Sequence, residues 1–128
     1  MILNQITVPS LDLVVSMDFY QKLGLKLIVK SLPHYLRFLC PDGHTTFSVH
    51  QVKHLPQGDG VWIYFECDDL EKQVDEFMKV GITFEDQPTD QPWLWKEVRL
   101  KDPDGNQLIL YHAGENRLNP PWRVKDVG

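Results

Sequence analysis

The segment RFLCPDGHTTFSVHQV (residues 37–52) is followed later in the chain by RLKDPDGNQLILYHAG (residues 99–114), with Arg, Pro-Asp-Gly and His at matching places. Asp-Gly tolerates the positive φ that tight hairpin turns need, so each copy predicts two antiparallel strands joined at Pro-Asp-Gly. We interpret both turns as structural, without a chemical role. A repeat of this length indicates two similar modules in one chain.

The residues before each hairpin repeat as well. A β-like run is followed by Asp-Leu and later by a glycine, at Asp12 and Gly24 in the first copy and at Asp69 and Gly81 in the second. These features predict helices over residues 11–23 and 69–80, each with an apolar face. The predicted strands lie near residues 2–8, 25–31, 34–40, 44–52, 61–67, 82–85, 93–101 and 106–112.

The predicted fold class is α+β, with two βαβββ modules that form a pseudo-twofold curved sheet around one cavity. A chain of 128 residues has the length of one ordinary domain. We assign residues 1–113 to this domain, with module one at 1–57 and module two at 58–113. Residues 114–128 are assigned to a C-terminal tail, in which the Pro-Pro-Trp segment could pack on the body or on a second subunit.

Composition and charge limit the class of partner. The formal net charge of -5 argues against nucleic acid, whose phosphates need a basic surface, and favours a small-molecule or protein partner. The first residues contain no basic and apolar leader, and no apolar run is long enough to span a membrane. We therefore expect a cytoplasmic protein that does not bind membranes. Cys40 and Cys67 lack a metal-type spacing and are expected to be reduced and structural.

Alternation along the predicted strands separates the side chains that pack on the helices from those that face a cavity. The packing set includes Leu36, Phe38, Leu94, Val98 and Leu100. The opposite set combines aromatic rings with a few polar groups, which is typical of a small-molecule site. It comprises Gln5, Tyr35, Arg37, Ser48, His50, Trp62, Tyr64, Trp95, Glu97, Arg99, Ile109 and Tyr111.

Two of these residues are positively charged and indicate the charge of the ligand. Arg37 and Arg99 occupy equivalent positions in the repeat, and two nearby guanidinium groups favour an anionic ligand or need carboxylate partners. For Glu97, the alternative to a role in the cavity is an ion pair with Arg99 on the sheet surface.

Several motifs resemble the vicinal oxygen chelate superfamily, the group of glyoxalase I, bleomycin-resistance proteins and extradiol dioxygenases. They are FYQKLG (residues 19–24), FECDDLEKQVDEF (65–77), PW (92–93) and DPDGNQLIL (102–110), within paired βαβββ modules. The resemblance covers residues 1–113. It implies the fold more strongly than an activity, because the superfamily includes lyases, isomerases, dioxygenases and metal-free drug binders. It also implies a homodimer, since members commonly dimerise and often build cavities across subunits.

Enzymes of that superfamily hold a divalent metal ion through up to four side chains on the first and last strands of each module. The resemblance places these positions at Gln5, Ser48, Trp62 and Ile109. Trp and Ile cannot coordinate a metal, and Ser stands where Glu is usual. We therefore expect no metal cofactor. The alternative is a shifted site in which Gln5 and His50, with Glu97 or Glu66, hold Zn, Ni, Fe or Mn.

Three functional hypotheses follow. The first is a small-molecule binding protein without the usual metal site, whose aromatic or anionic ligand stacks on Trp62, Tyr64, Trp95 and Tyr111. The second is a glyoxalase-like, metal-dependent lyase or dioxygenase in which Glu97 and His50 are catalytic. The third is a structural or interaction module whose cavity is filled by its own aromatic side chains.

Overall fold

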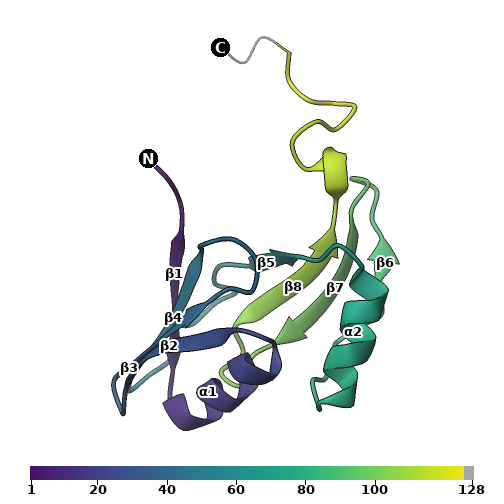
Figure 1. Cartoon of the computed structure of the whole chain (residues 1–128). Helices are drawn as coiled ribbons and strands as arrows, with labels where there is room; N and C mark the ends of the chain where they lie inside the picture. The colour runs from purple at the N-terminus through teal and green to yellow at the C-terminus, as the bar shows by residue number, and fades with distance from the viewer. Residues whose placement is uncertain (126–128) are drawn as a thin grey trace.

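The repeat seen in the sequence is a structural repeat of two βαβββ modules (Figure 1). The computed structural model describes residues 1–125. Module one contains β1 (Gln5–Ser10), α1 (Leu13–Lys22), β2 (Lys26–Ser31), β3 (Tyr35–Leu39) and β4 (Thr46–Gln51). Module two contains β5 (Ile63–Glu66), α2 (Leu70–Lys79), β6 (Thr89–Asp90), β7 (Lys96–Lys101) and β8 (Gln107–His112), followed by the 3₁₀ helix η1 (Gly114–Asn116). The predicted α+β class and module order are confirmed.

Each module forms its own four-stranded mixed sheet. The strand orders are β1-β4-β3-β2 and β5-β8-β7-β6, and in each sheet the first strand runs parallel to its neighbour. Within residues 1–125 no strand pair joins the two sheets, so the predicted curved sheet is not closed within one chain. As a result, β1 and β5 are edge strands with one unpaired side.

The two helices begin and end at the residues that the sequence indicates. Asp12 caps α1 by accepting a hydrogen bond from the backbone N–H of Val14 (3.0 Å), and Asp69 caps α2 by accepting one from that of Lys72 (3.2 Å). Gly24 (φ 93°) and Gly81 (φ 98°) follow the helix ends in the left-handed conformation that favours glycine.

Two sequence predictions in module two are wrong. No strand forms at residues 82–85. This segment makes a single backbone hydrogen bond to β7, from the Glu85 N–H to the Arg99 carbonyl (2.9 Å), and not the series of bonds that defines a strand pair. The short strand β6 forms at Thr89–Asp90 instead. Leu94 is 48% exposed, although its place in the alternation predicted burial. Leu94 has a φ of 67° and lies in a turn, which is closed by a hydrogen bond from the Leu94 N–H to the Gln91 carbonyl. Strand β7 therefore begins after this residue.

The inner faces of both sheets and one face of each helix form a single apolar core. Leu36, Phe38, Val98 and Leu100 are all fully buried in it, as predicted. The core is continuous between the modules, because the rings of Phe47 and Phe65 lie 5.9 Å apart. The remaining faces of the sheets point away from this core.

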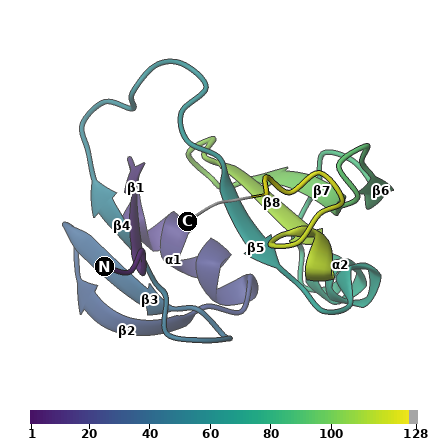
Figure 2. The same cartoon turned by 90° about the horizontal axis from the view of Figure 1, so that it is seen from above.

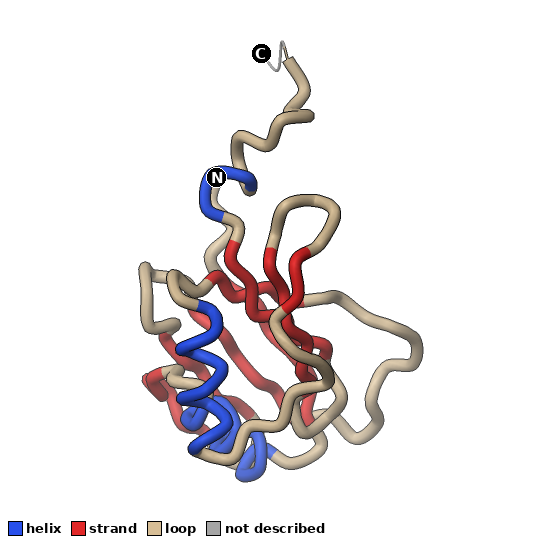
Figure 3. Tube along the Cα trace, turned by 90° about the vertical axis from the view of Figure 1, so that its right-hand side faces the viewer, coloured by secondary structure: helices blue, strands red, loops and turns tan. Residues whose placement is uncertain are grey.

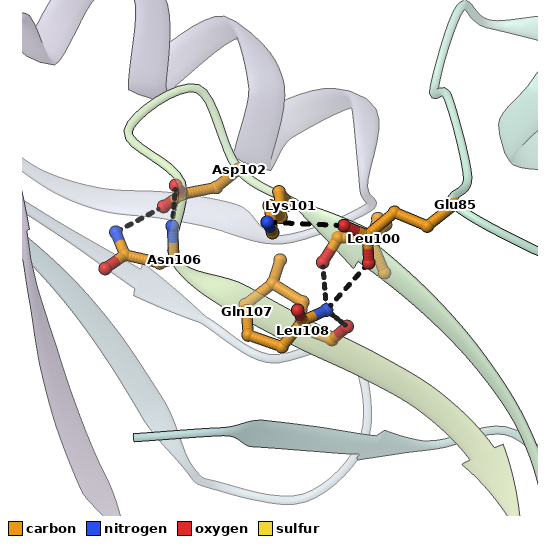
Figure 4. A network of polar contacts seen from close by, with 7 residues as sticks. All are labelled: Glu85, Leu100, Lys101, Asp102, Asn106, Gln107 and Leu108. Carbon is orange, nitrogen blue, oxygen red and sulfur yellow. Dashed lines mark hydrogen bonds and ion pairs between the residues drawn. The ribbon is translucent and has the colours of Figure 1, made fainter. Parts of the chain in front are cut away.

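A buried carboxylate joins the two modules. Asp102, at the start of the module-two turn, is 5% exposed and accepts a hydrogen bond of 2.6 Å from the hydroxyl of Tyr20 on α1. It also accepts hydrogen bonds from the side chain (2.7 Å) and the backbone of Asn106, as Figure 4 shows. The backbone N–H of Asp104 is a further donor (2.9 Å). Burial, with Asp102 and Asp104 nearby, raises the pKa of Tyr20 far above its usual value, so this hydroxyl stays a donor.

The same turn makes further contacts with module one. Asp104 accepts hydrogen bonds from the Leu11 backbone (2.9 Å) and the Ser16 hydroxyl (3.2 Å), and the Asn106 side chain donates to the Pro9 carbonyl (3.2 Å). We call this set of hydrogen bonds between the turn of residues 102–106 and module one the inter-module clasp. The Pro-Asp-Gly turns are therefore structural, as predicted, but one of them also holds the modules together.

The pseudo-symmetric counterpart of the clasp is not formed. In the repeat, Asp102 corresponds to Cys40 and Tyr20 to Phe77, so neither partner can make the buried hydrogen bond. A cavity of ≈ 320 Å³ lies there instead, between Asp42 of the module-one turn and the start of α2. Cys67 lines it, and burial, with acidic neighbours, raises the pKa of its thiol to about 11.

The connection between the modules, residues 52–62, is a long loop that arches away from both sheets (Figure 2). Beyond η1, the tail runs outward from the body (Figure 3), and Trp122 is 57% exposed. Within the described residues, no helix is long and apolar enough to cross a membrane.

Candidate functional site

The polar residues that face outward from module one form one hydrogen-bonded group, which we call the Tyr35 cluster: Gln5, Tyr35, Arg37 and Ser48. The Gln5 amide donates to the Ser48 hydroxyl (2.6 Å), which also lies 2.6 Å from the Tyr35 hydroxyl. The Nε of Arg37 donates to the same Tyr35 oxygen (3.0 Å). Alternation along β1, β3 and β4 brings these four side chains to one face, because Tyr35, Arg37 and Ser48 are all on adjacent, paired strands.

The Tyr35 cluster lowers the pKa of its phenol. Burial alone raises the pKa of Tyr35, but the hydrogen bonds from Ser48 and Arg37 and the positive charge of Arg37 outweigh that effect. The hydrogen bonds and the positive charge all stabilise the ionised form of the Tyr35 oxygen. Tyr35 therefore differs from an ordinary surface tyrosine in being a stronger acid.

The structure does not bring together the two residues of the predicted shifted metal site. Gln5 pairs with Thr46 on β4, whereas His50 is four positions further along the same strand, roughly 13 Å away along the backbone. The Gln5 amide is already hydrogen-bonded to Ser48 and Thr46. The exposed His50 instead lies opposite Tyr35.

The outward face of module two carries an aromatic group, which we call the aromatic cluster: Tyr64, Trp95, Tyr111 and Ile109. Trp95 and Tyr111 stack at 4.7 Å between ring centroids, and Tyr64 contacts both edge-on, at 5.9 and 5.5 Å. Ile109 and Tyr111 are buried, whereas Tyr64 is 40% exposed. Stacked rings with one exposed edge offer a surface on which a planar ligand can pack.

Two further predicted residues lie on module two as a pair. The guanidinium of Arg99 lies 4.7 Å from the ring centroid of Trp62, a cation–π geometry. Trp62 is 45% exposed. The ion pair between Arg99 and Glu97 that the sequence offered as an alternative is not formed, and no salt bridge within residues 1–125 uses either Arg37 or Arg99.

Glu97 is a buried carboxyl group beside the aromatic cluster. It is 6% exposed and is paired with Tyr111 across β7 and β8. Burial raises the pKa of Glu97, and Arg99 and a hydrogen bond from Trp93 only partly oppose the increase. A carboxyl group with a raised pKa can hold or transfer a proton nearer to neutral pH than an ordinary glutamate.

This pKa shift predicts how stability depends on pH. Because the folded state binds the Glu97 proton more tightly than the unfolded state, ionised Glu97 destabilises the fold, and this cost disappears as pH falls through the folded-state pKa. Glu97→Gln should therefore raise the free energy of unfolding more at pH 8 than at pH 5. Urea unfolding at the two pH values measures this difference. The exposed Glu76→Gln is the control, and an equal gain at both pH values would contradict the prediction.

Glu66 and Trp95, which the sequence analysis considered for other roles, hold the start of the tail against the aromatic cluster. The carboxylate of Glu66 accepts hydrogen bonds from the backbone of Ala113 (2.7 Å) and Gly114 (3.0 Å), and the Trp95 indole donates to the Asn116 carbonyl (3.2 Å). Arg117 pairs with Glu66 at 3.6 Å. The contacts of the tail with the body described here are thus made by residues 113–117, which no local pattern marked, and packing of the Pro-Pro-Trp segment on a second subunit stays a prediction.

The Tyr35 cluster and the aromatic cluster are not joined within one chain. No hydrogen bond, ion pair or aromatic contact connects them in the part of the chain that the structure describes. A cavity of ≈ 460 Å³ between β1, β4 and β5 is lined by Tyr64, Tyr111 and Arg117, but by none of Tyr35, Arg37 or Ser48. The two clusters are therefore separate groups of side chains, one on each sheet.

The donor set at the four positions implied for a metal does not fit a divalent ion. Gln5 and Ser48 are hydrogen-bonded to each other. Ile109 is buried in the aromatic cluster, and the Trp62 ring packs against the Arg99 guanidinium, so neither side chain can coordinate a metal. No group of three or more His, Cys, Asp or Glu side chains with a geometry suited to a metal is found among residues 1–125.

The two βαβββ modules, each with its own four-stranded mixed sheet, define the class of fold to which the chain belongs. The Glyoxalase/Bleomycin resistance protein/Dioxygenase superfamily model matches residues 2–110, and the chain belongs to that superfamily. A search of curated proteins gives no match.

Solved structures share the fold at low sequence identity. A lactoylglutathione lyase from Agrobacterium tumefaciens is 18% identical, with a TM-score of 0.74 over 92% of this chain and 96% of that one. A glyoxalase/bleomycin resistance protein/dioxygenase from Nocardioides is 18% identical, with a TM-score of 0.78 over 97% and 89%. A bleomycin resistance determinant encoded on the transposon Tn5 is 20% identical, with a TM-score of 0.71 over 88% and 98%.

Proposed function

We propose that this chain is a binding protein for an aromatic anion, and that it acts as a homodimer with two ligand cavities. In this proposal, each cavity is formed by the aromatic cluster of one chain and the Tyr35 cluster of the other. The observation that carries the proposal is that the two clusters face outward on separate sheets and do not meet in one chain.

The edges of the sheets support a second copy as the partner. β1 and β5 each have one unpaired side, and exposed apolar residues precede both, namely Ile2 and Leu3 before β1 and Val61 and Trp62 before β5. Pairing these edges with the equivalent edges of another copy would satisfy backbone groups and cover apolar surface. The long connection of residues 52–62 gives the modules room for such an arrangement.

Charge supports an anionic ligand. The chain has a net charge of -5, yet both walls carry a guanidinium group without a carboxylate partner in the described residues, Arg37 on one and Arg99 on the other. A planar aromatic ring would stack on Trp95, Tyr64 and Trp62, and its anionic group would bind a guanidinium bidentately.

A ligand screen tests this function. A ligand that binds only the folded state raises the free energy of unfolding, by about 2.7 kcal/mol when its concentration is a hundred times Kd. The melting temperature rises as a result. We expect aromatic carboxylates such as 1-naphthoate to stabilise the protein and the neutral 1-naphthamide to do so less. Light scattering after size exclusion should give a dimer. A monomer at micromolar concentration, or no stabilisation by any aromatic acid, would contradict the proposal.

Glu97 supports a second candidate, a lyase or dioxygenase of the glyoxalase type. A buried carboxyl group with a raised pKa beside the ligand wall is suited to proton transfer, and His50 would be the second catalytic group. Such an enzyme needs a metal at a shifted site. Elemental analysis that shows stoichiometric metal, lost on His50→Ala, would favour this candidate over the first.

A further inference from the structure

The hydrogen bonds of the Tyr35 cluster fix which proton points outward. Ser48 is fully buried, and its hydroxyl has two partners, Gln5 and Tyr35. The group of Gln5 that faces Ser48 is the amide nitrogen, a donor, because the same nitrogen donates to the Ile6 carbonyl (3.1 Å), which can only accept. If Tyr35 also donated to Ser48, the serine proton would be buried without an acceptor, which is costly. Ser48 therefore donates to Tyr35.

This direction leaves the Tyr35 oxygen as a double acceptor. It receives one hydrogen bond from Ser48 and one from the Nε of Arg37, so its own proton is free to point away from the cluster. Arg37 is exposed, its guanidinium carbon lies 5.4 Å from the centroid of the Tyr35 ring, and its terminal N–H groups make no hydrogen bond or ion pair with another side chain within residues 1–125. A phenol O–H and a guanidinium side by side, both unused, match the two oxygens of a carboxylate.

We propose that Tyr35 and Arg37 form the oxyanion-binding pair of the ligand site, in which the phenol donates its proton in a hydrogen bond to a carboxylate or enolate oxygen. This assignment rests on the function proposed above and identifies which chemical group of the ligand is recognised, and where. Ser48 and Gln5 are positioning residues, since they orient the phenol and do not touch the ligand.

The strand neighbours of Tyr35 and Arg37, all among the described residues, carry no negative charge that would oppose such a ligand. Its neighbour on β4 is His50, and its neighbour on β2 is Ser31; Val29, also on β2, lies opposite Arg37. On the paired strands β2, β3 and β4 of the described chain, the charged or titratable groups beside the phenol are thus a guanidinium and an imidazole. The lowered pKa of Tyr35 agrees with this geometry, because an oxygen that accepts two hydrogen bonds makes its own proton a better donor.

A tyrosine titration tests the network without a ligand. The chain has four tyrosines, and burial raises the pKa of Tyr20, Tyr64 and Tyr111, whereas that of Tyr35 is lowered. Absorbance at 295 nm should therefore show one tyrosine ionising first and separately. Tyr35→Phe should remove that phase, and Ser48→Ala should move it to higher pH. Ser31→Ala, the control on β2, should leave it in place. If the first phase persists in Tyr35→Phe, the assignment is wrong.

A binding experiment with 1-naphthoate tests recognition. Tyr35→Phe should weaken binding roughly tenfold, the value of one hydrogen bond to a charged group. Wild-type affinity should fall as pH rises through the Tyr35 pKa, because a phenolate repels a carboxylate, and His50→Asn should retain this fall. Unchanged affinity in Tyr35→Phe would overturn the assignment and leave the proposed function standing. No binding of 1-naphthoate by the wild type would overturn both.

Discussion

Replacing Asp102 with alanine is expected to lower the free energy of unfolding by roughly 3–5 kcal/mol, a large part of the stability of a domain this size. The substitution leaves the Tyr20 hydroxyl, which is fully buried, without its acceptor. It also frees the backbone N–H groups of Asp104 and Asn106 and opens the turn that holds module one. Urea unfolding, followed by tryptophan fluorescence, measures the loss.

The repeat provides a matched control. Asp42 lies at the equivalent turn of module one, is exposed and makes no side-chain hydrogen bond within residues 1–125, so Asp42→Ala should change the free energy of unfolding by less than about 0.5 kcal/mol. Tyr20→Phe should cost roughly 1–2 kcal/mol, and a double-mutant cycle with Asp102→Ala should show strong coupling. Similar losses for Asp42→Ala and Asp102→Ala would show that the clasp has no special role.

Mixing two binding-defective variants is expected to restore binding. Trp95→Ala removes a stacking surface of module two, and Arg37→Ala removes a cation of module one; each alone should weaken 1-naphthoate binding roughly 30-fold. If each cavity is shared between chains, a heterodimer of the two variants has one doubly defective cavity and one intact cavity. Random reassortment of the chains should then restore about a quarter of the sites at wild-type affinity.

The alternative arrangement gives a different result. If both clusters of a cavity came from the same chain, every cavity in the mixture would carry one substitution, and no high-affinity sites would appear. Isothermal titration of the mixture after slow refolding separates the two cases by stoichiometry. Trp95 is partly buried, so Trp62→Ala, at an exposed position, serves as a second module-two variant if Trp95→Ala lowers the melting temperature.

The sequence predicts the local structure of this chain well because its signals are local. Asp12 and Asp69 as caps, Gly24 and Gly81 as helix ends, and the two Pro-Asp-Gly turns each act within a few residues. Alternation then assigns Leu36, Phe38, Val98 and Leu100 to the core. The same argument fails at Leu94, because a turn with a positive φ begins there and ends the period-two pattern.

Contacts between distant segments could not be predicted in this way. Tyr20 and Asp102 are 82 positions apart, and nothing near either residue identifies the other. Alternation also predicted which side chains share a face, but it does not place one face relative to the other. Alternation correctly grouped Tyr35 and Ser48 with Gln5, and Tyr64 with Tyr111. The two groups nevertheless lie on different sheets.

The one-sided clasp shows how a duplicated chain can lose its internal symmetry without losing its architecture. A pseudo-twofold repeat offers each inter-module contact twice, and one copy is sufficient to fix the angle between the halves. Asp102 and Tyr20 make this contact between the halves. Cys40 and Phe77, at the equivalent positions of the repeat, do not need to form a hydrogen bond. The cavity beside Asp42 lies where a second clasp would be, so within residues 1–125 hydrogen bonds of this kind join the two halves on one side of the molecule only.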